Sequence, residues 1–216
     1  MAITNTSEWH GPRYWKNRSL EERLQNAKIP KKFEKVTLED YDKNIGDHDV
    51  QYAIMTWLKS ADENIKNGSG LYLFGGTGVG KTHLAQALLK QTIVNHKVSG
   101  MFIPATNYIE MMYDEISNEG NLPEEYSTPY LAKYLRGVYD LVVLDSLGDE
   151  NDTEFTRRSI SNLINHRHNA QLPIIITSLY NPKKLATRYG ERLLSVITDS
   201  CRLLPIAGTD QRNARK

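Results

Sequence analysis

One segment, Gly75-Gly-Thr-Gly-Val-Gly80-Lys81-Thr82, constrains the fold of this chain more than any other part of its sequence. It has the pattern of a glycine, any four residues, a second glycine, a lysine, and a serine or threonine. Glycines let the backbone turn with positive φ, so that several amide N–H groups can point at one phosphate. The apolar run Leu71–Phe74 precedes the segment, and a helical pattern follows it to about Asn95. A strand, this turn and a helix together predict a nucleotide phosphate-binding loop.

The loop assigns a role to each kind of residue in it. We expect Lys81 to reach the β- and γ-phosphates and the Thr82 hydroxyl to bind Mg²⁺. The N-terminus of the following helix adds a partial positive charge. ATP and Mg²⁺ are therefore the expected cofactors. A glycine-rich turn that binds nothing is the alternative interpretation, and the full match between a strand and a helix argues against it. The residues expected to bind the nucleotide are Gly75, Gly76, Thr77, Gly78, Val79, Gly80, Lys81, Thr82 and His83.

A second apolar run, Leu141–Leu144, ends in Asp145. We expect it to form a parallel strand beside the strand of the loop, with Asp145 at its carboxyl end completing the Mg²⁺ site with Thr82. The next residue is Ser146, where many P-loop ATPases have an acid that orients the attacking water. Loss of a positioned base commonly slows a reaction by about 10²–10⁴. Tight nucleotide binding with slow turnover is thus expected, with Asp149 and Glu150 as candidate substitutes.

The apolar runs alternate with helical patterns. This alternation predicts an α/β fold in which a parallel sheet is covered by helices on both faces. The expected strands are 71–74, 101–103, 141–144 and 174–176, and the expected helices are 47–67, the helix ending at about 95, a helix capped by Thr106, and 154–168. Residues 29–216 are expected to form this single domain.

Residues 1–28 are expected to form a short N-terminal arm. The arm contains Trp9, Tyr14 and Trp15, and Ser19 with Glu22 has the spacing of a capping box that opens a short helix. The aromatic residues either fold back onto the domain or anchor a partner protein, since Trp and Tyr dominate interface hot spots.

Composition excludes several classes of protein. The formal net charge of +1 argues against indiscriminate nucleic-acid binding, so any DNA contact would be local, weak or shared among subunits. The single cysteine, Cys201, excludes an intrachain disulfide and a multi-cysteine zinc site. Residues 1–10 lack the features of a secretory signal, and no apolar stretch approaches the roughly 20 residues that cross a bilayer. We expect a cytoplasmic protein, bacterial or encoded by a phage and acting in the host cytoplasm, with no membrane partner.

With these motifs in place, the chain resembles the DnaC/DnaI-type helicase loaders of the AAA+ ATPases and the related IstB-type transposition helper ATPases. The resemblance covers about residues 29–216. Its segments are Ile29-Pro-Lys-Lys-Phe33, the loop followed by His83-Leu84-Ala85, Leu144-Asp-Ser-Leu-Gly148, Pro173-Ile-Ile-Ile-Thr-Ser178 and Tyr189-Gly-Glu-Arg-Leu193.

The resemblance implies an AAA+ fold and further roles. It puts residues 29–33 near the adenine, and Thr177 and Ser178 near the γ-phosphate, with Lys81, Asp145 and Thr177 as the catalytic set. It makes Arg212 a nucleotide-binding arginine near the C-terminus, although a solvated tail charge is an equal alternative.

Three positions depart from the family pattern, and all three concern hydrolysis. They are Ser146, Leu179 where the family often has asparagine, and Val196 where the family places an arginine finger. Such a finger contributes 10³–10⁵ in rate in other P-loop systems. Arg192 or Arg202 could move into that role, but neither matches the motif. The expected ATPase is therefore weak or dependent on assembly.

The function implied by the resemblance is that of an accessory ATPase of DNA replication. Its expected partners are a replicative helicase, single-stranded DNA and further copies of itself in a ring or spiral. Three alternatives stay open: a transposition helper that binds duplex DNA and a transposase, a non-hydrolysing ATP-bound adaptor, and a small-molecule kinase. The kinase is disfavoured because no arginine-rich lid pattern follows Asp145. The short arm favours a phage protein.

Two residue sets are candidates for DNA contact. Aromatic residues beside basic ones can stack unpaired bases, although core packing is the more ordinary explanation. Basic residues on the helix after Asp145 are either a DNA-contacting patch or a solvated face. The sets are Tyr126, Tyr130, Tyr134 and Tyr139 with Lys133 and Arg136, and Arg157, Arg158, Arg167 and His168.

Overall fold

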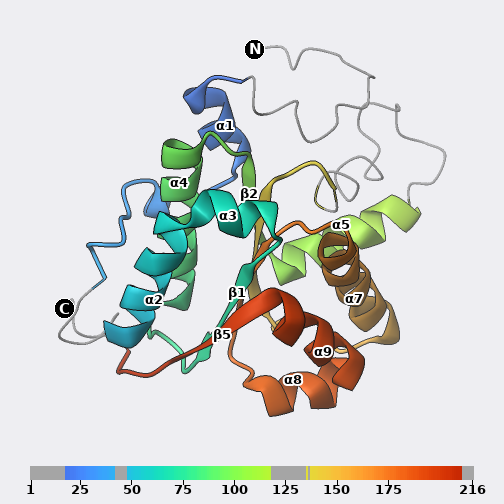
Figure 1. The fold of residues 1–216 in the computed structure, drawn as a ribbon. Helices are drawn as coiled ribbons and strands as arrows, with labels where there is room; N and C mark the ends of the chain where they lie inside the picture. Colours follow the sequence, from blue (N-terminus) through green and yellow to red (C-terminus); the bar gives the residue numbers. More distant parts are fainter. Residues whose placement is uncertain (1–17, 42–47, 118–134, 136, 211–216) are drawn as a thin grey trace.

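A single parallel sheet of five strands forms the centre of the molecule (Figure 1). The computed structural model describes residues 18–41, 48–117, 135 and 137–210. The strands are ordered β2-β3-β4-β1-β5 across the sheet. Their bounds are β1 Gly70–Gly75, β2 Gly100–Pro104, β3 Leu141–Leu147, β4 Ile174–Ser178 and β5 Cys201–Ile206.

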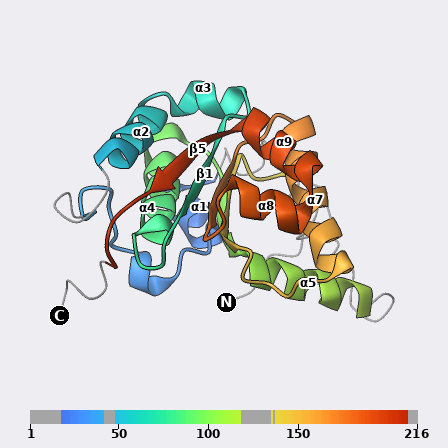
Figure 2. The same ribbon diagram turned by 90° about the horizontal axis from the view of Figure 1, so that it is seen from below.

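Helices cover both faces of the sheet, which confirms the predicted α/β fold (Figures 1 and 2). The strand β1 shows why its residues form a continuous apolar run. Leu71 and Leu73 pack into the core on one face, and Tyr72 packs into the core on the other. One face carries α1 (Leu20–Asn26), α2 (His48–Lys59), α3 (Ala61–Lys66) and α4 (Lys81–His96), and the other carries α5 (Ala105–Ser117), α7 (Glu154–Asn169), α8 (Pro182–Tyr189) and α9 (Glu191–Ser200).

The sheet order corrects one expectation. We expected the strand of Asp145 to lie beside the strand of the phosphate loop, but β4 lies between β3 and β1. The end of β4, with Thr177, therefore stands between the loop and Asp145. Asp145 still reaches the loop because α4, which begins at the loop, lies across both β3 and β4.

Some element boundaries also differ from the predictions. The helix expected over 47–67 is two helices, since the backbone leaves the helical region at Ser60 (φ −103°, ψ 23°). The Asn64 side chain donates to the Trp57 carbonyl oxygen (2.9 Å), which a continuous helix would pair with a backbone N–H. Thr106 does not cap α5, because the helix already begins at Ala105.

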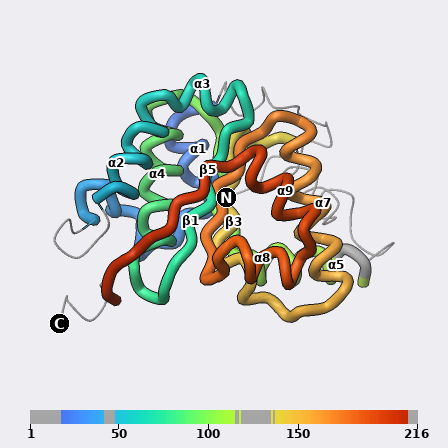
Figure 3. The backbone as a smooth tube through the Cα atoms, turned by 60° about the horizontal axis from the view of Figure 1, so that its bottom comes forward, coloured from blue at the N-terminus to red at the C-terminus, as the bar shows by residue number. Residues whose placement is uncertain are grey.

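The last strand and the two helices before it were not predicted. Figure 3 follows the backbone from α8 and α9 into β5, which among the described strands pairs only with β1 and so forms an edge of the sheet. Proline removes a backbone donor and is tolerated in an edge strand. Pro205 lies within β5 and obscures the strand pattern in the sequence.

The helix α1 falls inside the range 1–28 that we assigned to an arm, and it packs on the domain. Its capping box is confirmed, with Ser19 and Glu22 exchanging both hydrogen bonds. The buried Arg23 side chain donates to the carbonyl oxygens of Ile93 (2.9 Å) and Val98 (3.2 Å). The expected partner-binding residues Trp9, Tyr14 and Trp15 lie outside the described residues, so the arm stays a prediction.

Within the part of the chain that the structure describes, no helix is both long enough and apolar enough to cross a membrane.

Candidate nucleotide-binding site

A cavity of about 510 Å³ opens where the phosphate loop meets the carboxyl ends of β3 and β4. Ligands of parallel α/β sheets bind at this edge, outside the carboxyl ends of the strands. The cavity brings together residues from the N-terminal segment, the loop, β3 and β4. Its lining consists of Lys32, Phe33, Thr77, Gly78, Gly80, Lys81, Thr82, His83, Asp145, Ser146, Asp149, Ser178 and Leu179.

The loop has the backbone that its glycines predict. Gly78 (φ 76°) and Gly80 (φ 96°) adopt left-handed conformations that other residues rarely adopt, and Gly80 is the N-cap of α4. Lys81 Nζ donates to the carbonyl oxygens of Gly75 (3.0 Å) and Gly76 (2.6 Å). The ammonium group therefore lies against the loop itself, at one side of the cavity.

Two further residues of the motif have different surroundings. The Val79 side chain is buried in the core, so this residue can offer only its backbone to a ligand. The Tyr41 hydroxyl donates to the Val79 carbonyl oxygen (3.3 Å). His83 lines the cavity, and its Nε2 lies 3.1 Å from the Thr37 carbonyl oxygen. These contacts join the N-terminal segment to the loop, and Lys32 and Phe33 of the predicted adenine-side segment line the same cavity.

Three side chains meet at one carboxylate oxygen. Thr82 Oγ1 donates to Asp145 Oδ1 (2.8 Å), and Thr177 Oγ1 donates to the same oxygen (2.7 Å). Asp145 is only 7% exposed. Burial raises the pKa of the Asp145 carboxyl, while the hydrogen bonds from Thr177, Thr82 and Ser146 lower it. The threonine hydroxyls thus offset part of the cost of burying this carboxylate.

The pair of Thr82 and Asp145 fits a magnesium ion. Mg²⁺ prefers oxygen ligands and is usually held by one or two carboxylates together with substrate phosphates. The Thr82 hydroxyl and the Asp145 carboxylate are in direct contact at the side of the phosphate loop. This donor set leaves the remaining coordination to phosphate oxygens and water.

Ser146 stands at a distortion of β3. Its φ is 60°, and the pairing of β3 with β4 changes register between Leu144 and Leu147. The Ser146 amide donates to Thr177 Oγ1 (2.8 Å), so that oxygen both donates to Asp145 and accepts from the next residue. A positive φ in a non-glycine residue and a bulge both occur more often beside functional sites. The Ser146 hydroxyl lies 3.4 Å from Asp145 Oδ2, at the limit of a hydrogen bond.

The residues expected near the γ-phosphate divide into two groups. Thr177 is 1% exposed and does not line the cavity. Its hydroxyl donates to Asp145 and so fixes the position of that carboxylate. Ser178 and Leu179 line the cavity. The Leu179 side chain is 46% exposed, at the position where we noted a departure from the family pattern. Arg212 lies outside the described residues, and its predicted contact with nucleotide is not tested.

The two acids after Gly148 have opposite surroundings. Glu150 is 5% exposed and accepts from Arg188 (3.0 Å), from the Tyr189 hydroxyl and from the Gly148 amide (2.9 Å). Asp149 is exposed and lines the cavity.

Arg188 is the residue at this site that sequence reasoning missed. It also donates to the Gly148 carbonyl oxygen (2.8 Å) and to the Tyr180 hydroxyl (3.0 Å). Its place directly before the Tyr189-Gly-Glu-Arg-Leu193 motif was the only signal in the sequence.

The structure narrows the candidates for contact with DNA. Arg167 is fully buried and donates to four backbone carbonyl groups, so it belongs to no basic surface patch. Tyr139 is buried as well and cannot stack on a base. Arg157 and Arg158 are surface residues of α7 and pair with Asp152 (2.6 Å) and Glu154 (3.8 Å). The predicted positions Tyr126, Tyr130, Tyr134, Lys133 and Arg136 lie outside the described residues.

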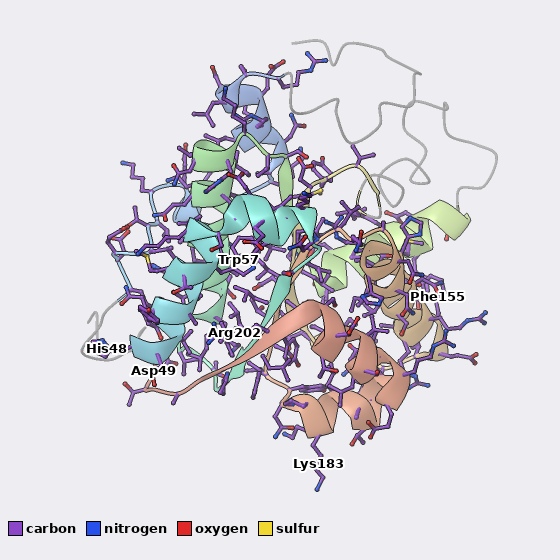
Figure 4. All side chains as sticks on the ribbon, in the orientation of Figure 1. His48, Asp49, Trp57, Phe155, Lys183 and Arg202 are labelled. Atoms are coloured by element: carbon purple, nitrogen blue, oxygen red, sulfur yellow. The ribbon has the colours of Figure 1, made fainter. Side chains whose placement is uncertain are left out.

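Val196, at the position where the family places an arginine finger, belongs to α9. Its side chain is partly buried and packs against the hydrophobic core. Arg192 is an exposed residue in the first turn of α9, and Arg202 is exposed on β5, where Figure 4 labels it.

A parallel sheet in this order, with a glycine-rich loop leading into α4 and a Thr82–Asp145 pair beside it, defines a P-loop ATP-binding protein of the AAA+ type. Comparison with known sequences then gives the family. Residues 12–216 match the family described as IstB-like ATP binding protein, and the chain belongs to that family.

Individual relatives are replication proteins. The replicative helicase loader DnaI of Bacillus subtilis (strain 168) is 29% identical over 136 residues, which are 61% of this chain and 40% of DnaI. The loader DnaC of Escherichia coli (strain K12) is 25% identical over 139 residues, which are 64% of this chain and 52% of DnaC. The matches thus span about half or less of these curated relatives.

A solved structure gives the same result. The crystal structure of the DnaC helicase loader superposes with a TM-score of 0.71 and 29% identity, over 82% of this chain and 100% of that one.

Proposed function

We propose that this chain is an ATP-binding accessory protein of DNA replication that loads or remodels a replicative helicase on single-stranded DNA, and that it hydrolyses ATP slowly. The observation that carries the proposal is the contact of Thr82 and Thr177 with one oxygen of Asp145 beside the phosphate loop. The similarity to DnaI and DnaC supports the link to a helicase. The arm of residues 1–28 is the proposed partner-binding segment, and residues 29–216 are the proposed ATPase domain.

Different residues of the cavity have different roles in binding ATP. Backbone amides of residues 75–80 cradle the phosphates, and Lys81 leaves its carbonyl partners to reach the β- and γ-phosphates. Thr82 and Asp145 hold Mg²⁺, which when bound neutralises charge that develops on the phosphate oxygens. Thr177 keeps the Asp145 carboxylate facing Thr82.

Slow hydrolysis follows from three neutral positions, two of them in the lining of this cavity and the third, Val196, in α9 outside it. Ser146 supplies no carboxylate, Leu179 supplies no polar group at the end of β4, and Val196 supplies no arginine finger. None of these residues takes part in holding phosphates or Mg²⁺. The proposed protein therefore uses ATP mainly as a switch, and assembly into a ring or spiral can add groups that one copy lacks.

The test is affinity purification of the tagged chain from its host with ATP present. The comparison is between wild type, Lys81→Ala and Lys183→Ala, which changes an exposed lysine of α8 that does not line the cavity (Figure 4). We expect a replicative helicase to be recovered with wild type and Lys183→Ala and to be lost with Lys81→Ala. Recovery of no helicase, or equal recovery with all three, would overturn the loader function.

A second candidate is a transposition helper ATPase, which the family description favours because it names IstB-like proteins. Recovery of a transposase in the same purification, with binding to duplex in preference to single-stranded DNA, would support this candidate instead.

A further inference from the structure

We propose that Asp149 is the carboxylate that orients the attacking water and takes its proton, in place of the acid absent at Ser146. This inference rests on the proposed ATP-binding function and assigns the slow hydrolysis to one residue.

The backbone after β3 returns Asp149 to the cavity. The Asp149 amide donates to the Ser146 carbonyl oxygen (3.1 Å), which closes a tight turn over residues 146–149. Gly148 within the turn has a φ of 107°, a conformation that favours glycine. Asp149 consequently lines the same cavity as Lys81 and Asp145, although it stands four positions after Asp145.

The charge of Asp149 acts on the metal-binding residue. It is one of the influences that raise the pKa of the Asp145 carboxyl, after burial as the main cause. Asp149 and Asp145 both line the one cavity, so the two carboxylates border the same space.

Glu150 cannot take this role in the same arrangement. Its Oε1 accepts from Arg188 and from the Tyr189 hydroxyl, and its Oε2 accepts from the Gly148 amide. A general base must reach the proton that it abstracts, directly or through one water. Glu150 does not line the cavity, and its two oxygens are held on the side of α8.

Arg188 holds the turn that presents Asp149. Its guanidinium donates to the Gly148 carbonyl oxygen (2.8 Å) and contacts Tyr180 and Glu150 as well. The position of Gly148 is closely packed, because a Cβ added there would lie 3.1 Å from the Tyr180 ring. The turn is thus held by Arg188 of α8, and Asp149 is the exposed last residue of the turn.

In the proposed hydrolysis of ATP, Asp149 acts as the general base. The water oxygen forms a bond to the γ-phosphorus, and the bond from that phosphorus to the β–γ bridging oxygen breaks. ADP leaves with the electron pair of the broken bond. The proton lost by the water passes to the Asp149 carboxylate and from there to bulk solvent, and inorganic phosphate is the second product.

The experiment measures ATP affinity and turnover separately on the purified chain. Affinity is measured by titration with a fluorescent ATP analogue, and turnover by phosphate release with ATP and Mg²⁺, with and without single-stranded DNA. The variant is Asp149→Asn, and Asp199→Asn is the matched control, since Asp199 is an exposed acid of α9 that pairs with His168 and does not line the cavity. Lys81→Ala gives the background from contaminating enzymes.

We expect Asp149→Asn to lower turnover about 100-fold, within the 10²–10⁴ range for loss of a general base, with ATP affinity changed less than about threefold. Asp199→Asn should leave both quantities unchanged. Adding Ser146→Asp to Asp149→Asn should restore turnover, because aspartate tolerates the positive φ at residue 146.

Three results would overturn the proposal: equal turnover in wild type and Asp149→Asn, a fall in turnover explained by an equal fall in affinity, or ATP binding by wild type with no turnover above the Lys81→Ala background. Failure to recover a helicase would remove the proposed partner alone, because this assay contains no helicase.

Discussion

The phosphate loop and the edge at the carboxyl ends of β3 and β4, which Arg188 of α8 supports from outside the lining, form two halves of one cavity and differ in how they are built. The loop is a continuous segment whose glycines, lysine and threonine each meet a local requirement. The opposite edge is assembled from three distant parts of the chain, represented by Asp145, Thr177 and Arg188. The first half is complete in its motif, and the second departs from the family pattern. Binding and hydrolysis of ATP can therefore vary independently in this architecture.

The largest expected effect concerns the stability of the assembled half. Replacing Arg188 by methionine leaves Glu150 buried without its cationic partner. In the wild type the Arg188 side chain is 12% exposed and the Glu150 side chain is 1% exposed. Breaking a buried ion pair costs about 3–5 kcal/mol, so we expect the free energy of unfolding to fall by about 3 kcal/mol. Urea denaturation measures it.

The double variant Arg188→Met/Glu150→Gln tests the reason for that loss. It should be less destabilised than the sum of its single variants, since the two residues are in contact. A loss below about 1 kcal/mol for Arg188→Met would show that the pair does not hold the turn.

The next effect concerns the loop. Lys81→Ala should lower ATP affinity about 100-fold, because hydrogen bonds to charged groups contribute about 1.5–3 kcal/mol each. The stability of the ligand-free chain should change little, since the Lys81 side chain is only partly buried and lines the cavity. Titration with a fluorescent ATP analogue gives the affinity, with Lys183→Ala as the control. Unchanged affinity would contradict the binding role of the loop.

A smaller effect tests whether Thr177 links the two halves. Thr177→Val keeps the shape of the side chain but removes the hydroxyl that contacts Asp145 and the Ser146 amide. We expect turnover to fall about 10-fold with ATP affinity nearly unchanged, since one hydrogen bond is worth about 1 kcal/mol. Phosphate-release assays on this variant and on Thr187→Val, an exposed threonine of α8, make the comparison. Loss of affinity in place of turnover would assign Thr177 to binding.

The smallest effect concerns the serine itself. Ser146→Ala should change turnover less than about twofold, because the hydroxyl lies 3.4 Å from Asp145 Oδ2 and forms at most a weak hydrogen bond. The same phosphate-release assay measures it. A tenfold fall would mean that the hydroxyl, and not Asp149, handles the water.

The same contrast explains what sequence reasoning could predict. Local patterns of apolar residues predicted the strand before the loop and the strand at Leu141, and residue spacing predicted the capping box of α1. Motif spacing also predicted that Lys81, Thr82 and Asp145 lie together at one cavity. The order of strands was not, since no local pattern states that β4 enters between β1 and β3.

Tertiary contacts account for the other differences. Arg167 looked like a surface charge but is surrounded by backbone carbonyl groups, and burial lowers its pKa to about 9. The choice between Asp149 and Glu150 depended on Arg188, which lies far along the chain. Pro205 concealed an edge strand.

The contact of Arg23 with the end of α4 has a mechanical consequence. The helix has 16 residues, a length of about 24 Å, and the phosphate loop and Arg23 lie at its opposite ends. Positive charge at the C-terminus of a helix is favoured by the helix dipole, which strengthens this attachment. A tilt of α4 by about 5° at the loop would displace the Arg23 end by about 2 Å. The helix α1 is thus attached at the end of α4 that lies opposite the phosphate loop, where a small tilt of α4 produces the largest displacement.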